Sequence, residues 1–234
     1  MASSVNYDLG WAHCYSLPRE WSLDANGLLL QKPYSGLEGM RKEEGAYSKE
    51  NFQINGAEAI STVSGRQVEV CATFQATGSA FGIDVLKSGN GHARISLSGS
   101  TLTVDLTSLA RINNDGGSFG GRYESALPTT IEVGQEVKLH VFLDGSILDI
   151  FVNDTYAASI RIYANDADAT GVALFAERNT QVVSAYAWNL DPSQDASQAI
   201  EEVRTDSKPC PSGVVYRIED DHSLHLYRGE VRIF

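Results

Sequence analysis

The sequence predicts an all-β protein built as a two-sheet antiparallel sandwich. Turn dipeptides that accept a positive φ recur along it, at Asn26-Gly27, Asn55-Gly56, Asn90-Gly91 and Asp144-Gly145. Between these turns lie runs rich in β-branched and aromatic residues, many of which alternate apolar and polar side chains with period two. Helical periodicity is almost absent before residue 193.

The alternation of apolar and polar side chains predicts where the strands lie. It is clearest in residues 101–106, where Leu102, Val104 and Leu106 fall on one face and polar side chains fall on the other. The expected strands are 67–74, 81–86, 93–97, 101–106, 136–143, 147–152, 156–163, 171–176 and 181–190. Strands this short with turns between them are typical of a sandwich rather than of an α/β fold.

Two segments depart from this rhythm, so the chain divides into residues 1–31, 32–190 and 191–234. The first segment has an aromatic opening followed by a hairpin around Asn26-Gly27. The last begins at Asp191-Pro192, where proline interrupts a continuing strand. Within it we predict one short helix over residues 193–204 and three short strands over 214–218, 224–227 and 231–234.

Composition excludes several classes of partner. The chain has 234 residues and a formal net charge of −12, and its Lys and Arg are scattered rather than clustered, so we expect no nucleic-acid partner. It has no run of eighteen apolar residues, so no membrane span is expected. The opening residues lack the basic and apolar regions of a signal peptide.

The three cysteines do not suggest a metal site or a disulfide scaffold. Cys14, Cys71 and Cys210 are far apart, odd in number and without a histidine at metal-ligand spacing. Cys14 and Cys71 lie in apolar stretches and are interpreted as small core residues. We therefore predict no metal ligands and no cofactor.

No acid pair in the sequence has a clear catalytic signature. Glycoside hydrolysis needs two carboxylates that converge on one cleft. Asp144 and Asp149 share one predicted hairpin, but Asp144 is a natural turn residue and Asp149 alternates with Leu148 and Ile150. Turn formation and a carboxylate on the strand's polar face therefore explain both better than catalysis does, and we assign no catalytic residue.

The sequence also does not match other catalytic and binding motifs. No serine lies in a GxSxG nucleophile elbow at a strand-to-helix turn, and the glycine-rich residues 113–121 lack the Lys-Ser/Thr ending of a phosphate-binding loop. His140 lies in mid-strand and His92 lies beside a turn, away from metal-ligand spacing. Aromatic rings bind sugars by stacking on their apolar faces, and the candidates are Trp11, Trp21 and Trp188. Their segments favour core burial, so the carbohydrate-binding residues stay unknown.

Several motifs together resemble glycoside hydrolase family 32, the invertase, levanase and β-fructosidase type. Residues 10–20 (GWAHCYSLPRE) are similar to the strand that closes the five-bladed propeller of that family. Residues 27–33 (GLLLQKP) resemble the entry into its C-terminal sandwich, and residues 38–41 (EGMR) resemble the "ELxxLR" that follows. Residues 139–154 (LHVFLDGSILDIFVND) and 161–163 (RIY) match two further motifs. The resemblance spans residues 10 to about 190.

The sequence departs from the family pattern in three places. The family's "DR" is Asp105-Leu106 here, so whatever that arginine pairs with in the family must differ in this chain. Asp149 replaces the commoner glutamate, and Ala164 replaces a proline. The three catalytic motifs of the propeller, "NDPNG", "RDP" and "EC", are absent, and Glu69-Val70-Cys71 is the nearest string. Without both carboxylates the double displacement does not run.

The resemblance implies a concanavalin-like or lectin-like jelly roll that is the C-terminal sandwich of a family 32 enzyme. Residues 1–31 would then be a remnant of the last propeller strands and a linker, 32–190 the sandwich and 191–234 an appendage. The implied function is non-catalytic: the module packs on the catalytic β-propeller of a sucrose- or fructan-hydrolysing parent and stabilises it. An autonomous fructan-binding module is the alternative.

Two further expectations follow from the resemblance. The face toward the missing propeller should be partly apolar and exposed, which favours self-association. The tail from Ala199 to Phe234 faintly resembles the C-terminal tails of exported Bacteroidetes proteins. The localisation stays unknown, with a secreted or cell-envelope parent as the expectation.

Overall fold

The computed structural model describes residues 14–109, 121–164 and 167–191, together with the backbone of three short strands between residues 214 and 232. The chain divides into two compact units. One contains Met1–Leu37 and Arg41–Asp191, and the other contains Glu38–Met40 and Pro192–Phe234.

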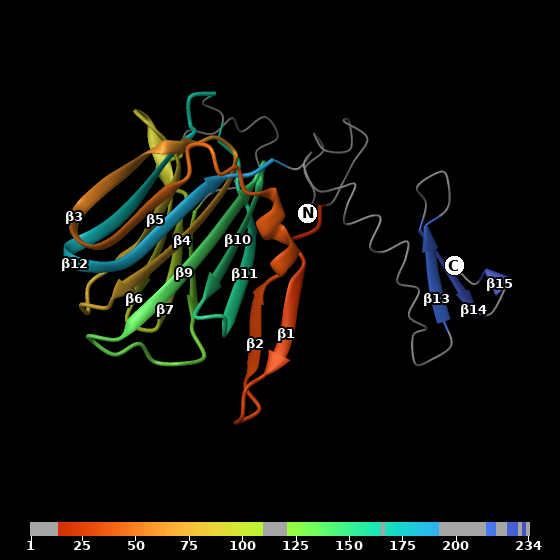
Figure 1. Cartoon of the computed structure of the whole chain (residues 1–234). Helices are drawn as coiled ribbons and strands as arrows, with labels where there is room; N and C mark the ends of the chain where they lie inside the picture. The colour runs from red at the N-terminus through yellow and green to blue at the C-terminus, as the bar shows by residue number, and fades with distance from the viewer. Residues whose placement is uncertain are drawn as a thin grey trace. The chain divides into compact units, whose positions relative to one another are not determined.

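The larger unit is a curled antiparallel sandwich with a hairpin at its N-terminal end, which confirms the predicted fold class (Figure 1). Its strands are β1 (Arg19–Leu23), β2 (Leu29–Pro33), β3 (Tyr47–Ser64), β4 (Gln67–Gln75), β5 (Phe81–Ser88), β6 (Gly91–Ser98), β7 (Thr101–Asp105), β8 (Arg122–Ala126), β9 (Glu136–Asp144), β10 (Ile147–Val152), β11 (Tyr156–Arg161) and β12 (Gly171–Asn189). A 3₁₀ helix, η1 (Ser35–Met40), follows β2.

Two long strands, β3 and β12, belong to both layers of the sandwich. The later part of β12 pairs with β4 and extends the order β11-β10-β9-β4-β12, which we call the first sheet. Its earlier part pairs with β5 and extends the order β12-β5-β6-β7-β8, the second sheet. β3 pairs with β12 along both parts. The register shifts between Ala176 and Thr180, and this irregularity turns one sheet into the other.

The irregularity between Ala176 and Thr180 corrects two expectations. Residues 171–176 and 181–190 were expected to form separate strands, but residues 171–189 form the single strand β12. Asn55-Gly56 was expected in a hairpin turn and instead lies within β3, opposite the irregularity in β12. Gly56 has a φ of 85° there, a conformation that glycine adopts without a Cβ clash. The dipeptide therefore marks a bend within a strand.

The core lies between the two sheets and follows the predicted alternation. On β9, the side chains of Val137, Leu139, Val141 and Leu143 face inward and are fully or almost fully buried. β4 and β10 contribute alternate residues in the same way. Because side chains of successive strand residues point to opposite faces, Phe142 and Phe151 lie on the outer face of the first sheet. They are buried nevertheless, so another part of the chain covers that face.

The sequence-based prediction missed β3 and β8 because both run along a sheet edge. β3 pairs only with β12, and only Ile54, Ile60 and Val63 of its residues are buried. Among the described strands, β8 pairs only with β7, and it contains no buried residue. A strand with one partner and little buried surface keeps polar side chains on both faces, which removes the hydrophobic signal.

In the smaller unit, β13 (Val214–Ile218), β14 (Leu224–Arg228) and β15 (Val231–Arg232) form an antiparallel three-stranded sheet in that order. These strands occur where short strands were predicted. The predicted helix over residues 193–204 lies outside the described residues. Across the described part of the chain, no helix is long and apolar enough to cross a membrane.

Candidate functional site

The segment that leads into the sandwich is held on the outer face of the first sheet by a buried acid, Asp149 of β10. The backbone nitrogen of Leu17 donates to Asp149 Oδ2 at 3.0 Å, and Arg19 Nη2 lies 3.3 Å from Asp149 Oδ1. Ser159 of β11 donates to the same carboxylate and accepts from Arg19 Nη2 at 2.5 Å. The Arg19 guanidinium also lies over the ring of Phe151. Asp149 therefore fixes the start of β1 against β10 and β11.

A second buried acid, Glu69 of β4, holds the segment where it leaves the 3₁₀ helix. Arg41 forms two parallel hydrogen bonds with Glu69, from Nε to Oε2 at 2.8 Å and from Nη2 to Oε1 at 2.7 Å. His140 Nε2 lies 2.7 Å from Glu69 Oε1, and the guanidinium stacks on Trp188 at 4.2 Å from the ring centroid. The Glu69 side chain is 1% exposed, so this ion pair is screened little by solvent.

The two acids and the rings between them form one layer, which we call the docked face. In the sheet register Asp149 lies opposite Phe142, and Phe142 lies opposite Glu69. His140 lies opposite Phe151 in the next row, and its ring is 4.6 Å from that of Phe142. Arg19 and Arg41 thus close over a polar and aromatic surface at two points, and the intervening chain is tied at both ends.

The protonation of the docked face depends on these contacts. Burial by itself raises the pKa of Glu69, but hydrogen bonds from Arg41 and His140 and their charges outweigh it, so the pKa lies below its usual value. Within the described part of the chain the neighbouring Cys71 has no such partner, and burial raises the pKa of its thiol to about 11. A thiol of this kind is a poor nucleophile at neutral pH.

We expect acid to weaken the attachment at Glu69. Its pKa is lower in the folded chain than in the unfolded chain, where it is about 4.3. The stabilisation is therefore fully present above that value and is lost as the pH falls through the folded pKa. Glu69→Gln should flatten the decline in the free energy of unfolding below about pH 4, measured by urea titration at successive pH values. The exposed Glu136→Gln is the control, and equal slopes for both variants would contradict the prediction.

The tied segment carries a hairpin, β1–β2, that presents apolar side chains to solvent. The turn is closed by Asp24 Oδ1, which accepts from the backbone nitrogens of Asn26 and Leu28, both at 2.8 Å. Trp21, Leu23 and Leu29 are 70%, 67% and 40% exposed. Because Leu23 pairs with Leu29 and lies two residues from Trp21, all three share one face. We call this the apolar hairpin face.

The hairpin also has fixed polar contacts that set its orientation. The backbone nitrogen of Gln31 donates to the carbonyl oxygen of Asp154 at 2.6 Å. Glu20 pairs with Lys32 across the hairpin at 2.9 Å and accepts from the backbone nitrogen of Ser35 at 2.8 Å. These bonds lower the pKa of Glu20 to about 2, with the hydrogen bond from Lys32 as the largest cause. The apolar hairpin face is therefore held at a defined place on the sandwich.

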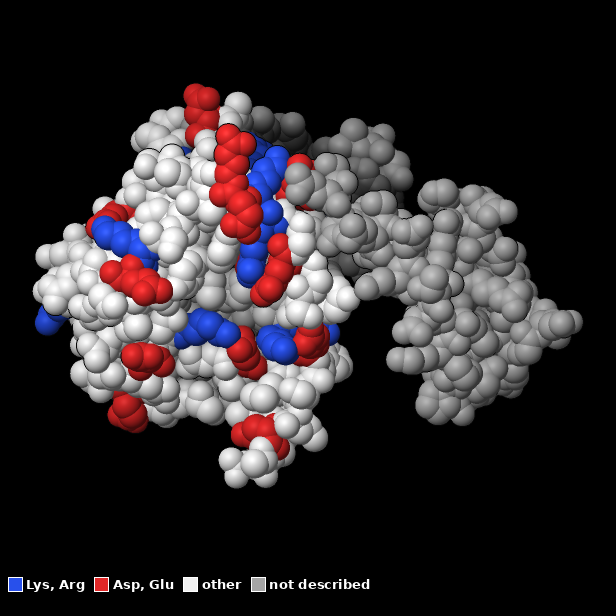
Figure 2. Space-filling view, in the orientation of Figure 1, with Lys and Arg blue, Asp and Glu red and all other residues white. Residues whose placement is uncertain are grey.

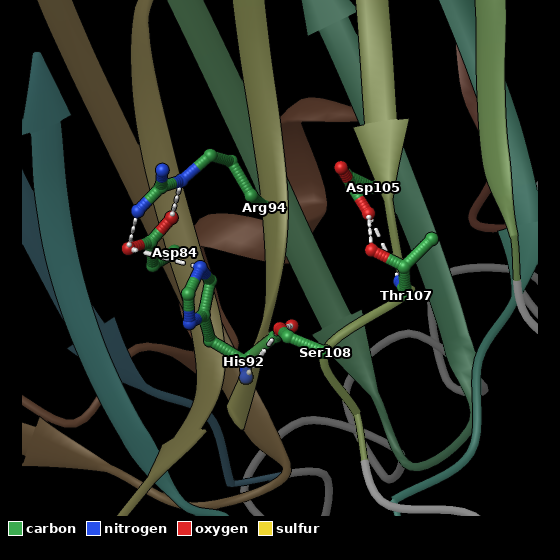
Figure 3. Close-up of polar contacts among 6 residues, drawn as sticks. All are labelled: Asp84, His92, Arg94, Asp105, Thr107 and Ser108. Atoms are coloured by element: carbon green, nitrogen blue, oxygen red, sulfur yellow. Dashed lines mark hydrogen bonds and ion pairs between the residues drawn. The ribbon is translucent and has the colours of Figure 1, made fainter. Parts of the chain in front are cut away.

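A separate polar cluster lies on the outer face of the second sheet (Figure 3). Arg94 of β6 makes a bidentate pair with the fully buried Asp84 of β5, at 2.8 and 2.9 Å. His92 Nε2 lies 3.9 Å from Asp84 Oδ2, and the Ser108 hydroxyl donates to the His92 carbonyl oxygen at 2.8 Å. Desolvation lowers the pKa of His92, although the Asp84 carboxylate opposes this. The cluster ties two strands and a turn together.

The neighbouring Asp105 shows how the departure from the family "DR" motif is accommodated. Leu106, in place of the arginine, is fully buried in the core. Asp105 accepts from the Thr107 hydroxyl at 2.6 Å and from its backbone nitrogen at 2.9 Å (Figure 3). Its cationic neighbour is Arg122 of β8, 3.7 Å away. The positive charge beside Asp105 therefore comes from the next strand, β8.

The acids considered for catalysis do not form an open pair. Asp144 is exposed at the β9–β10 turn, whereas Asp149 is fully buried and accepts three hydrogen-bond donors. Glu69 is equally buried and lies within a sandwich strand. Among the described residues, no group of three or more His, Cys, Asp and Glu could hold a metal ion.

Two expectations about burial were wrong. Trp21 was expected in the core but is largely exposed, and Cys14 was expected in the core but is also exposed. Trp188 is half-buried between Arg41 and Tyr186, and Cys71 is half-buried on the docked face. Trp11 lies outside the described residues. The charged side chains on the face shown in Figure 2 include both signs close together, without a broad basic patch.

Comparison with known proteins gives consistent matches. The family model described as "Glycosyl hydrolases family 32 C terminal" matches residues 36–189. A sucrose-6-phosphate hydrolase of Zymomonas mobilis subsp. mobilis is 30% identical over 197 residues, which cover 81% of this chain and 36% of that protein. The chain thus spans just over a third of the length of this curated relative.

Solved structures share the fold. Fructan 1-exohydrolase IIa from Cichorium intybus superposes with a TM-score of 0.66 at 18% identity, over 81% of this chain and 43% of that chain. An exo-inulinase from Aspergillus awamori superposes with a TM-score of 0.65 at 20% identity, over 77% of this chain and 36% of that chain. At this level of identity the likeness concerns the fold alone.

Proposed function

Because this chain belongs to the family of C-terminal domains of family 32 glycosyl hydrolases, we propose that it is the non-catalytic sandwich module of an enzyme that hydrolyses sucrose or fructans. In this role it packs on the catalytic β-propeller and stabilises it. The names of the similar proteins, a sucrose-6-phosphate hydrolase and a fructan exohydrolase, support the substrate class. The share of the relative that the chain spans leaves room there for a separate catalytic part.

The hydrogen bonds that already occupy the two buried acids support a non-catalytic role. A retaining glycosidase needs a nucleophilic carboxylate and an acid/base carboxylate on either side of the substrate bond. Glu69 and Asp149 are each fully buried and hydrogen-bonded to an arginine of the leading segment. Neither reaches a substrate without the loss of those contacts. Their geometry fits the attachment of a segment.

The observation that carries the proposal is the apolar hairpin face on a hairpin that is firmly tied to the sandwich. Trp21, Leu23 and Leu29 are exposed together, whereas arginine–carboxylate pairs at Arg19 and Arg41 hold the chain on either side of the hairpin. Large apolar side chains grouped on a surface are typical of a contact with another protein part. A hairpin fixed at its base offers this contact without a large loss of conformational entropy.

The proposal is tested with this chain and with the catalytic part that the proposal assigns to the same protein. The purified chain should show no turnover of sucrose, inulin or levan. When it is added to the separately produced catalytic part, the melting temperature of that part should rise, and the Trp21→Ser chain should raise it less. Turnover intrinsic to this chain would overturn the non-catalytic role. An unchanged melting temperature with the unsubstituted chain would overturn the stabilising role.

We expect the isolated chain to self-associate through the apolar hairpin face. Burial of apolar surface is worth about 25 cal/mol per Å², and exposed Trp21 and Leu23 have no cover within the described sandwich. The apparent mass from light scattering should rise with concentration. The double variant Trp21→Ser, Leu23→Ser should remove most of this rise, whereas Val133→Ser, an exposed apolar residue elsewhere, should leave it unchanged. A strictly monomeric chain at high concentration would contradict this.

A second candidate function, autonomous fructan binding, is favoured by one observation: the exposed Trp21 indole offers an apolar face to a sugar ring. Calorimetry with fructo-oligosaccharides decides the matter. Heat that saturates at millimolar ligand and disappears in Trp21→Ser would support a binding module. No heat would leave the docking role.

A further inference from the structure

The open side of the sandwich contains a cavity that the proposed docking role does not use. Its volume is about 330 Å³. It lies between the outermost strand of each sheet, β8 and β11, where the two sheets are not joined by a shared strand. Its walls include Leu102, Val104, Ile150 and Ile160, together with the smaller Ser125 and Ala158. A volume of this size lies within the range of small-molecule sites.

The cavity exists because small side chains occupy inward-facing positions. Ala158 pairs with Ile150, and Ser125 pairs with Leu102. Ile150 and Leu102 belong to the buried core, so their cross-strand partners face the interior of the sandwich as well. Larger apolar residues at these two positions would fill the space as in an ordinary close-packed core. The small side chains of Ala158 and Ser125 therefore leave this end of the core unfilled.

The chemistry of the walls selects the ligand. The hydroxyl of Ser125, which lines the cavity, is 2.6 Å from the hydroxyl of Tyr156, which is not among the lining residues, and either one can be the donor. Two hydroxyl groups that share one hydrogen bond retain one hydrogen, which is free to be donated further. No other hydrogen bond to either hydroxyl occurs among the described residues, so a ligand with an acceptor atom could take this hydrogen. The acid at the rim, Glu124, is paired with Arg122 at 2.8 Å.

A sugar does not fit these walls. Each sugar hydroxyl that loses water needs a new hydrogen-bond partner, and the aliphatic side chains that form much of the walls supply none. An uncharged ring with one acceptor oxygen does fit, because its body buries apolar surface and its oxygen accepts the remaining hydroxyl hydrogen. Tyr123, 44% exposed at the rim, offers a further ring contact.

We propose that this cavity is a binding site for a small uncharged molecule with an apolar ring and a single hydrogen-bond acceptor. The proposal is independent of the docking role, since the apolar hairpin face contributes no residue to the cavity. The experiment titrates the whole chain with acetophenone, which has an aromatic ring and one carbonyl oxygen. Methyl NMR signals of Ile150, Ile160 and Leu102 report occupancy. We expect shifts that saturate and are confined to the methyl groups that line the cavity.

Two variants test the details of the site. Ala158→Phe fills the cavity and should weaken acetophenone binding by at least about tenfold. Ser125→Ala should weaken acetophenone binding by roughly threefold to tenfold but leave the binding of ethylbenzene, which has no acceptor, unchanged. If Ala158→Phe fails to fold, Ala158→Leu replaces it, and Ala157→Leu on the opposite face of β11 is the control.

The outcomes are distinct. Saturable shifts that both variants weaken as expected support the site. An absence of saturation up to the solubility limit of acetophenone would overturn it, as would shifts that persist in the filled variant. Equal effects of Ser125→Ala on acetophenone and ethylbenzene would overturn the assigned hydrogen bond. Trp21→Ser should leave binding unchanged, which separates this result from the test of docking.

Discussion

Arg41→Ala should destabilise the sandwich by about 3–5 kcal/mol, because it leaves the carboxylate of Glu69 buried without its main counter-charge. Arg41 provides both parallel hydrogen bonds to that carboxylate and also covers Trp188. His140 remains as a single partner and does not replace a bidentate pair. The free energy of unfolding, measured by urea titration and monitored by tryptophan fluorescence, reports the loss.

The matched control for Arg41→Ala is Lys49→Ala. Lys49 pairs with Glu58 at 2.5 Å, but both side chains are exposed. Water solvates either charge when its partner is removed, so no measurable change in the unfolding midpoint is expected. Equal losses of unfolding free energy in the two variants would contradict the prediction, because burial of Glu69 would then add nothing to the cost of removing its partner. Glu69→Leu combined with Arg41→Leu should recover much of the stability, because it removes both charges at once.

Asp149→Ala should destabilise the chain by about 3 kcal/mol and also release the start of the hairpin. The substitution removes the acceptor for the backbone nitrogen of Leu17, the guanidinium of Arg19 and the hydroxyl of Ser159. Arg19 then stays against Phe151 without an anion beside it. Limited proteolysis should cut this variant near Arg19 faster than the unsubstituted chain, and the sandwich fragment should survive.

Asp144→Ala is the control for Asp149→Ala, since it removes a carboxylate from the same hairpin at an exposed turn. We expect little change in stability and no change in the rate of cleavage near Arg19. Faster cleavage in both variants would mean that the β9–β10 hairpin as a whole, and not the Asp149 carboxylate, holds the leading segment. Ser159→Ala should give an intermediate rate, because Arg19 keeps its ion pair in that variant.

The sequence predicted the interior of the sandwich well because the interior obeys a local rule. Alternation on β9 and β10 depends on residues two apart, and the structure confirms it. The edge strands β3 and β8 were missed because the same rule gives no signal where so few side chains are buried. Asn55-Gly56 was misread because a residue pair that permits a tight turn also permits a bend inside a strand.

The contacts of the docked face lay beyond sequence reasoning. Glu69 meets an arginine 28 positions away and a histidine 71 positions away, and Asp149 meets Arg19 across 130 positions. Arg19 and Arg41 both lie in motifs that resemble the family, which was the available signal, but nothing in those motifs names their partners. Trp21 was expected in the core because its segment looked packed, whereas Leu23 and Leu29 of the same hairpin share its exposure.

The sharing of β3 and β12 between both sheets has a consequence for how the chain folds. Neither layer is complete until both strands have formed, and β12 follows most of the other strands in the chain. Partial structures that lack β12 therefore leave β4 and β5 without a common neighbour. Contacts between segments so distant in sequence close large loops. The entropy cost of closing these loops slows the search for the native state. We expect millisecond-to-second folding with a single cooperative transition, in which the two layers appear together rather than one after the other.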